Sequence, residues 1–331
     1  MKTVSKIKSP ESLLEWRGQM GATGVTVVAG TFDLFQPGNL YAIRTAAALG
    51  APVMVVVEPD DVVVRHVPAG RPQHSLETRI EMVSHLREVA VVTSLAEGKE
   101  SGFFRKLAPF VAVADRSGQP QPYRQILEAT ATRLEEIGLL PGCFTGDIIR
   151  SIKEHQTPIL LPGGWDANPV HRKLILKPGR VTVAVNGCFD ILHVGHLRLL
   201  AKARGMGDSL SVLVNSDASV VRYKGPTRPV FPEAFRVATL TALSSVDEVL
   251  VFSGDNPLAE LRQLRPMIHV KGGSYEADRV REERELLESW GGRLVCTPMV
   301  DAFSTTRFIH HALNSGSHVQ DSPPGEKCDN V

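Results

Sequence analysis

The chain has 331 residues, of which 43% are hydrophobic and 22% are charged, and this composition excludes a wholly disordered, collagen-like or coiled-coil protein. The formal net charge of +1 lacks the basic excess that general nucleic-acid binding requires, so any anion-binding site has to be local. At about 100–200 residues per domain, the length predicts two domains.

No apolar run approaches the ~18–20 residues of a membrane helix, and the opening segment MKTVSKIKSP lacks the apolar core of a signal peptide. We therefore expect a cytoplasmic protein without membrane or nucleic-acid partners. The cysteines stand apart with no CxxC pair, which favours free thiols over a disulfide framework or a thiolate zinc site. They are Cys143, Cys188, Cys296 and Cys328.

An internal repeat divides the chain. The segment GTFDLFQPGNL beginning at Gly30 recurs as GCFDILHVGHL beginning at Gly187, an offset of 187 − 30 = 157 residues. The same offset relates Asp60 to Asp217, Arg71 to Arg228, Arg79 to Arg236 and Pro109 to Pro266. Such a long period predicts two copies of one domain, over 1–160 and 181–314. A Gly/Pro-bearing linker over 161–180 joins them, and a polar, disordered tail is expected over 315–331.

Each copy opens with an apolar run typical of a β-strand, over 25–29 and 181–185, followed by a Gly-containing turn and a helical segment. In the second copy, strand patterns at 210–214, 248–252, 267–270 and 293–296 alternate with helical patterns at 232–243, 257–264 and 277–289. This alternation predicts an α/β fold class with two tandem Rossmann-like, doubly wound parallel sheets. Ligands on such sheets bind at the carboxyl ends of strands, which makes 186–190, 215–217 and 271–275 candidate segments.

The segment His193-Val194-Gly195-His196 follows a strand and begins a helix, with its two imidazoles three residues apart on one helical face. Gly195 leaves room for a bulky anion, and the helix start supplies free N–H groups and a positive dipole end. The pattern predicts a phosphate site. Two alternatives are ordinary surface or capping histidines and a metal site, although a third ligand at a suitable spacing is missing.

Further polar residues fall on the same sheet edge. Lys224, Arg228 and Arg236 follow the second strand, and Lys271-Gly272-Gly273 follows a later one. A hydroxyl cluster, Ser304-Thr305-Thr306, begins another helix. Each of these groups alone is commonly a solvated charge or an N-cap, but together they describe a polyphosphate cradle.

These motifs carry a resemblance to a known family. NGCFDILHVGH, together with NSD at 215–217, KGPTRPV at 224–230, VKGGSY at 270–275 and FSTTRFI at 303–309, resembles the cytidylyltransferase-like nucleotidyltransferase superfamily. Within it, the second copy resembles the D-glycero-β-D-manno-heptose 1-phosphate adenylyltransferase domain, which makes ADP-heptose. The lead-in to the first copy resembles the start of that domain, and a fused sugar-kinase domain is not present in the sequence.

The resemblance implies roles for individual residues. His193 and His196 would hold a nucleoside triphosphate, and Lys224 and Arg228 would stabilise the transferring group. The further nucleotide-binding residues would be Gly187, Cys188, Phe189, Gly195, Lys271, Gly272, Gly273, Ser304, Thr305 and Thr306. Sugar-phosphate contacts would come from Asp190, Asn215, Asp217 and Arg236. Mg²⁺ would arrive with the triphosphate, with Asp190 and Asp217 as alternative contacts, and either aspartate could instead be a turn residue that bonds its own loop.

The first copy lacks most of these groups. The offset places Gln36 at His193, Asn39 at His196, Val67 at Lys224 and Ala114 at Lys271. A Phe-Thr-Gly-Asp segment over 144–147 stands where the second copy has its hydroxyl cluster. We therefore expect a catalytically inactive first domain that folds like the second and acts as a built-in dimer partner.

Two other functions fit the same residues. One is a CTP-dependent cytidylyltransferase acting on phosphoethanolamine, glycerol 3-phosphate or a similar alcohol phosphate. The other is a non-catalytic sensor of nucleotide or sugar phosphate, which the complete set of charged groups in the second copy argues against. The sequence leaves the base, the acceptor phosphate and any homo-oligomer open.

Overall fold

The computed structural model describes residues 5–20, 24–67, 71–115, 123–138, 145–153, 179–273 and 277–298. Most of the predicted linker, the predicted tail over 315–331, Cys143, Cys328 and the hydroxyl cluster Ser304-Thr305-Thr306 lie outside these residues. In the described part of the chain, no helix has the length and apolarity needed to cross a membrane.

The first domain contains a five-stranded sheet and flanking helices. Its strands are β1 (Thr26–Gly30), β2 (Val53–Val57), β3 (Val89–Ser94), β4 (Val111–Asp115) and β5 (Arg133–Ile137). Its helices are α1 (Pro10–Gly18), α2 (Pro37–Ala48), α3 (Asp60–His66), α4 (Leu76–Ser84), α5 (Glu100–Leu107) and α6 (Arg124–Thr130), with α7 (Thr145–Lys153) after the last strand.

The second domain repeats this arrangement. Its strands are β6 (Thr182–Gly187), β7 (Ser209–Asn215), β8 (Glu248–Phe252), β9 (Ile268–Gly272) and β10 (Arg293–Thr297). Its helices are α8 (Val194–Arg204), α9 (Asp217–Lys224), α10 (Glu233–Thr241), α11 (Leu258–Leu264) and α12 (Arg281–Glu288), the last preceded by a 3₁₀ turn over Ala277–Val280.

Both sheets are parallel throughout and have the same strand order. The first runs β3-β2-β1-β4-β5, and the second runs β8-β7-β6-β9-β10. Between β1 and α6, the bounds of each element agree with those of its counterpart 157 residues later to within about two residues. The predicted doubly wound α/β fold, present twice, is therefore confirmed.

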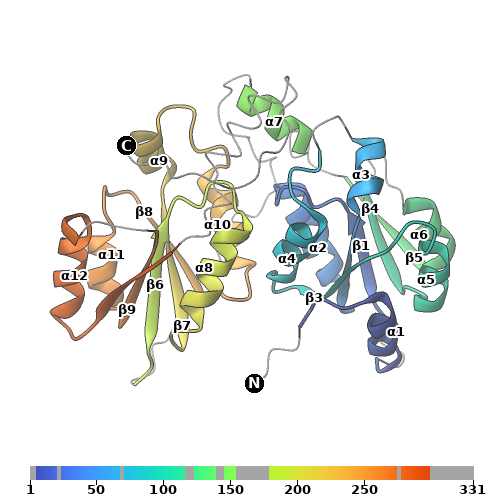
Figure 1. Cartoon of the computed structure of the whole chain (residues 1–331), viewed down its shortest axis with the longest axis horizontal. Helices are drawn as coiled ribbons and strands as arrows, with labels where there is room; N and C mark the ends of the chain where they lie inside the picture. The colour runs from blue at the N-terminus through green and yellow to red at the C-terminus, as the bar shows by residue number, and fades with distance from the viewer. Residues whose placement is uncertain are drawn as a thin grey trace, which may run out of the picture.

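The central strands are apolar because helices cover both faces of each sheet. Strand β2, with the sequence VMVVV, is buried at every position, and so is β7. Figure 1 shows α5 and α6 on the outer side of the first sheet and α11 and α12 on the outer side of the second, while α2 and α4 face α8 and α10 in the centre. The largest apolar cluster of the described residues runs through this central layer and includes side chains of both domains.

The domains meet about a pseudo-two-fold axis. Leu86 forms an antiparallel bridge with Leu243, and these two residues are equivalents under the 157-residue offset. Two backbone hydrogen bonds flank the bridge, from Arg87 N to Ala242 O at 2.7 Å and from Ser244 N to His85 O at 2.9 Å. Equivalent surfaces therefore pair with each other, as in an isologous dimer, but inside one chain.

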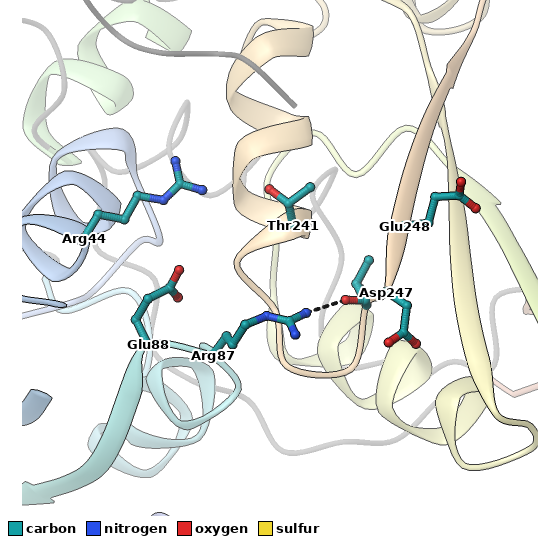
Figure 2. A pocket seen from close by; sticks show the side chains of 7 residues that line it. Arg44, Arg87, Glu88, Thr241, Asp247 and Glu248 are labelled. Atoms are coloured by element: carbon teal, nitrogen blue, oxygen red, sulfur yellow. Dashed lines mark hydrogen bonds between the residues drawn. The ribbon is translucent and has the colours of Figure 1, made fainter. Parts of the chain in front are cut away.

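Polar contacts at this interface are less symmetric. Arg87 Nη2 donates to the carbonyls of Leu243 at 3.0 Å and Val246 at 2.6 Å, and Arg198 of α8 pairs with Glu81 of α4 at 2.6 Å. Arg87 also lines a cavity of about 180 Å³ between the domains, and Figure 2 shows its guanidinium directed across the cavity to the Val246 carbonyl. The interface therefore combines an apolar centre with a polar rim.

Candidate active site

The start of α8 forms the centre of the candidate site. His193 is its N-cap residue, in an extended conformation, and its side chain makes no capping hydrogen bond. In the first domain, Gln36 accepts a hydrogen bond from Gly38 N at 2.6 Å, and the Asn39 side chain completes a capping box. Side chains therefore occupy the N–H groups at the start of α2, whereas the uncapped start of α8 can bind an anion.

The two predicted imidazoles are stacked, with ring centroids 3.7 Å apart and ring planes 24° from parallel. Nδ1 of both rings is buried with no hydrogen-bond partner among the residues that the structure describes. Burial, helped by the neighbouring His74, lowers the pKa of His193 to about 4. Burial, with a contribution from His193, also holds the pKa of His196 well below its ordinary value. Both rings are therefore neutral at pH 7 and can donate one N–H each to a phosphate oxygen.

The loop after β6 packs against the imidazole of His196. Phe189 has a φ of 48°, in the left-handed region, and its buried ring lies edge-on to His196 at a centroid distance of 5.4 Å. A Cβ atom at Gly187 would lie 3.1 Å from the Phe189 ring, so a larger residue there would press on this ring. The structure thus uses Phe189 to support His196 rather than for the predicted nucleotide contact.

Positive groups gather around Cys188, which follows β6. Its thiol lies 3.7 Å from Asn215 Oδ1, and burial raises the pKa of the thiol. Lys224, Arg236 and Arg228 act on that pKa in the opposite direction, and Asp190 acts in the same direction as burial. Arg236 donates to the carbonyl of Cys188, and Arg228 pairs with Asp190. Lys224 is the last residue of α9 and is exposed. The predicted cations therefore come together at one edge of the sheet.

Asp190 anchors the loop between α9 and α10. Its Oδ2 accepts a hydrogen bond from Arg228 Nε at 2.6 Å, and its Oδ1 accepts from the N–H groups of Val230 at 2.8 Å and Phe231 at 2.9 Å. Asp33 makes the same three bonds in the first domain, to Arg71, Gln73 and His74. Because the domain without the histidines keeps this arrangement, the prediction that Asp190 contacts the sugar phosphate is corrected to an anchoring role.

Arg236 requires a similar correction. Its side chain is fully buried and donates to the carbonyls of Cys188 and Asn215, both at 2.7 Å, and to Asp217 Oδ1 at 2.8 Å. Arg79 of the first domain is equally buried and pairs with Asp60. The guanidinium therefore ties the ends of β6 and β7 to α9, which leaves it unsuited to the predicted contact with substrate.

The remaining predicted carboxylate and amide contacts are also engaged within the fold. Asp217 Oδ1 accepts from Glu233 N at 2.8 Å as well as from Arg236, and Asn215 Nδ2 donates to Ser219 Oγ at 3.0 Å. The described residues contain no group of three or more His, Cys, Asp or Glu side chains that could hold a metal ion. Asp217 Oδ1 and Asn215 Nδ2 therefore have partners within the fold, while the Asp217 side chain stays 43% exposed.

Lys271, Gly272 and Gly273 lie at the carboxyl end of β9, as predicted. The ammonium of Lys271 donates to Glu283 Oε1 at 2.7 Å, and only 11% of its side chain is exposed. Gly273 has a φ of 116°, which favours glycine, and its N–H donates to Thr297 O at 2.8 Å. The structure thus gives Lys271 an acidic partner on α12 that the sequence analysis does not identify.

The sequence analysis does not identify two further residues near Lys271, namely His269 and Glu283. His269 is fully buried, with Nε2 3.2 Å from Asn186 Oδ1 and Nδ1 3.3 Å from Glu283 Oε2, and burial, with a contribution from Lys271, lowers its pKa to about 3. Asn186 is the next-to-last residue of β6, and the sequence identifies it only as the start of the candidate segment 186–190. The repeat contains a signal that distinguishes these positions. The 157-residue offset matches Asn186, His269, Lys271 and Glu283 to the apolar residues Ala29, Ala112, Ala114 and Ile126.

Comparison with known proteins gives the class. The cytidylyltransferase-like family matches residues 27–130 and 184–310, once in each domain and over most of the chain. The chain belongs to the cytidylyltransferase-like family, which is a class of nucleotidyltransferase enzymes.

Several curated relatives carry the name Bifunctional protein HldE. The protein of Syntrophotalea carbinolica is 48% identical over 138 residues, which are 42% of this chain and 28% of that protein. The protein of Geotalea uraniireducens is 50% identical over 139 residues, again 42% of this chain and 28% of that protein. That of Streptomyces coelicolor is 47% identical over 152 residues, or 46% and 32% of the two chains. The matched part of the chain thus spans a third or less of these relatives.

Among solved structures, a lipopolysaccharide core biosynthesis protein from Thermoplasma volcanium is 28% identical, with a TM-score of 0.32, and the match covers 37% of this chain and 97% of that one.

Proposed function

We propose that the second domain transfers AMP from ATP to a sugar 1-phosphate such as heptose 1-phosphate and releases pyrophosphate. The observation that carries this proposal is the uncapped start of α8, at which His193 and His196 each keep a buried Nδ1 without a hydrogen-bond partner among the described residues. The corresponding helix start in the first domain is closed by Gln36 and Asn39. The choice of ATP and of a heptose phosphate is supported by the motif resemblance and by the HldE relatives.

In this reaction an oxygen of the sugar phosphate attacks the α-phosphorus of ATP. The bond from the α-phosphorus to the oxygen that bridges to the β-phosphate breaks, and pyrophosphate leaves with the electron pair. Because the nucleophile is already an anion, catalysis rests on alignment and on stabilising negative charge rather than on a strong base. The neutral imidazoles of His193 and His196 would donate to the triphosphate, and Lys224 and Arg228 would offset charge on the transferring and leaving groups.

The remaining proposed contacts rest on the motif resemblance. Lys271, Gly272 and Gly273 would face the ribose and base, and the hydroxyl cluster Ser304-Thr305-Thr306 would bind the outer phosphates. Mg²⁺ would enter as part of the bound triphosphate. No step is assigned to it, because Asp190 and Asp217 are already paired with arginines.

A pyrophosphate-release assay tests the proposal. The full chain is incubated with ATP or CTP and with sugar 1-phosphates, phosphoethanolamine or glycerol 3-phosphate in turn. We expect release with ATP and a sugar 1-phosphate. Faster release with CTP and an alcohol phosphate would identify a cytidylyltransferase, and nucleotide binding without release under any condition would identify a sensor; either result would overturn the proposal.

A pair of variants tests which domain is active. His196→Ala removes a donor aimed at the triphosphate, and we expect kcat to fall by roughly 100-fold or more, as for other donors to a transition state. Asn39→Ala changes the equivalent position of the first domain and should leave kcat nearly unchanged. Equal losses in the two variants would contradict the assignment of activity to the second domain alone.

A further inference from the structure

Four polar side chains form a buried network on the outer face of the second sheet. Lys271 Nζ lies 2.7 Å from Glu283 Oε1, and Glu283 Oε2 lies 3.3 Å from His269 Nδ1. His269 Nε2 lies 3.2 Å from Asn186 Oδ1. The His269 side chain is fully buried, and those of Lys271 and Glu283 are 11% and 10% exposed. The network therefore holds an ion pair and a neutral imidazole largely away from water.

The first domain shows that this fold does not need the network. Strands β4 and β9 are equivalent, as are α6 and α12, yet the matching residues of the first domain are Ala29, Ala112, Ala114 and Ile126. Ala112 is fully buried in a sheet of the same strand order. Because removing charges from water is costly, an apolar replacement is often as stable as a buried ion pair. A network present only beside the proposed site therefore points to a role in that site.

The network joins two strand ends that border the site. Val185 of β6 is in register with Val270 of β9, so Asn186 and Lys271 follow at the same level of the sheet. Beyond Asn186 begins the loop that supports the imidazoles of the HVGH segment, and beyond Lys271 come the two glycines proposed to face the ribose and base. Glu283 holds the β9 end through its bond to Lys271, and it packs against His269, although Glu283 Oε2 and His269 Nδ1, 3.3 Å apart, share no hydrogen bond.

We propose that Glu283 is a positioning residue that fixes Lys271 through their hydrogen bond and packs against His269, and thereby sets the affinity of the second domain for its nucleotide. The inference rests on the proposed function, since it takes the nucleoside triphosphate as the ligand of this edge. Glu283 itself lies on α12 and acts through its neighbours. Its loss should therefore weaken nucleotide binding more than it slows the chemical step.

The test uses Glu283→Gln in the full chain. We expect KM for ATP, and Kd for a non-hydrolysable ATP analogue in a calorimetric titration, to rise roughly tenfold or more, the loss typical of a charge-assisted hydrogen bond. The kcat at saturating ATP should change less than about threefold, since a uniform loss of binding leaves kcat unaffected. Glu283→Asp, which keeps the charge, should recover part of the affinity.

Glu248→Gln is the matched control. Glu248 is also a buried acid in this sheet, with Oε2 2.8 Å from Ser211 Oγ, but it lies at the start of β8, at the opposite end from the site. The Glu248→Gln variant should leave KM for ATP and Kd for the analogue unchanged even if it lowers the melting temperature. An equal rise in KM for both variants, or unchanged affinity in Glu283→Gln, would overturn the inference.

A second variant guards against a simple folding defect. Asn186→Ala, His269→Ala, Lys271→Ala and Glu283→Ile together install the residues of the first domain, in which the same elements pack. We expect an unchanged circular dichroism spectrum with loss of analogue binding at concentrations that saturate the wild type. If the wild type and this variant bind the analogue with equal affinity, only the inference is overturned. If the wild type binds no nucleotide, the inference and the proposed function are both overturned.

Discussion

The stacked pair His193 and His196 couples the candidate site to the stability of the protein. Two imidazoles with centroids 3.7 Å apart cannot both be protonated at small cost, and burial adds to that cost. The folded protein therefore keeps both rings neutral in the range where the unfolded chain would protonate them. In the first domain, an amide stands at each of these positions, which removes the cost together with the chemistry.

This difference predicts a pH effect at the residue scale. The pKa of His193 is about 4 in the folded state and about 6.5 when unfolded, so the unfolded state binds more protons between these values. The free energy of unfolding should therefore decrease as the pH is lowered through this window, by about 2 kcal/mol from pH 7 to pH 5 from His193 alone. His193→Gln with His196→Asn should show a smaller loss in urea unfolding at the two pH values. An identical loss in wild type and variant would contradict the assignment.

At the scale of elements, the loop between α9 and α10 shows how fold and site share residues. Asp190 holds this loop through Arg228 and two backbone N–H groups, and Asp33 holds the equivalent loop of the first domain. The same loop carries Arg228, which we propose lies beside the transferring phosphate. Under the proposed function, an anchor common to both domains would have a functional consequence only in the second.

The two anchors form a matched pair of variants. Asp190→Asn and Asp33→Asn each leave a buried arginine facing a neutral amide, and each should lower the free energy of unfolding by about 3 kcal/mol, as expected when one partner of a buried ion pair is lost. Only Asp190→Asn should also reduce nucleotidyl transfer. Activity that falls equally in both variants would show that the loop of the first domain serves the site as well.

At the scale of the whole molecule, the pseudo-two-fold interface joins the domains through equivalent surfaces that are no longer identical. Arg87 has Ser244 as its counterpart, and only the arginine reaches across to two carbonyls. Ser244 Oγ donates to His85 O at 2.9 Å, a carbonyl that already accepts from the Ser244 N–H. The two positions therefore contribute unequally to the contact.

This asymmetry gives a prediction for the interface. Arg87→Ala leaves the Val246 carbonyl without its side-chain donor, while the Leu243 carbonyl keeps the Val246 N–H at 3.2 Å, and the change should lower the free energy of unfolding by about 1–3 kcal/mol. Ser244→Ala should cost less than about 1 kcal/mol, because the His85 carbonyl keeps its backbone partner. Chemical denaturation of both variants measures the difference, and a larger loss in Ser244→Ala would contradict the interface described.

Much of the fold followed from the sequence because the repeat and the apolar runs are local patterns. The position of His193 and His196 at a helix start followed for the same reason. Arg236 was misassigned because its charge is visible in the sequence but its buried partners are not. Glu283 was missed because its contact with His269 depends on the packing of a helix on a strand, which no local pattern reports.

The pairing of Leu86 with Leu243 has an evolutionary consequence. In a dimer of identical subunits, every mutation near the axis occurs twice and must be tolerated on both sides at once. Here a single mutation alters one side alone, while the covalent connection keeps the halves together at high effective concentration. One half could thus lose its ligand-binding groups and specialise as a scaffold while the other kept its chemistry.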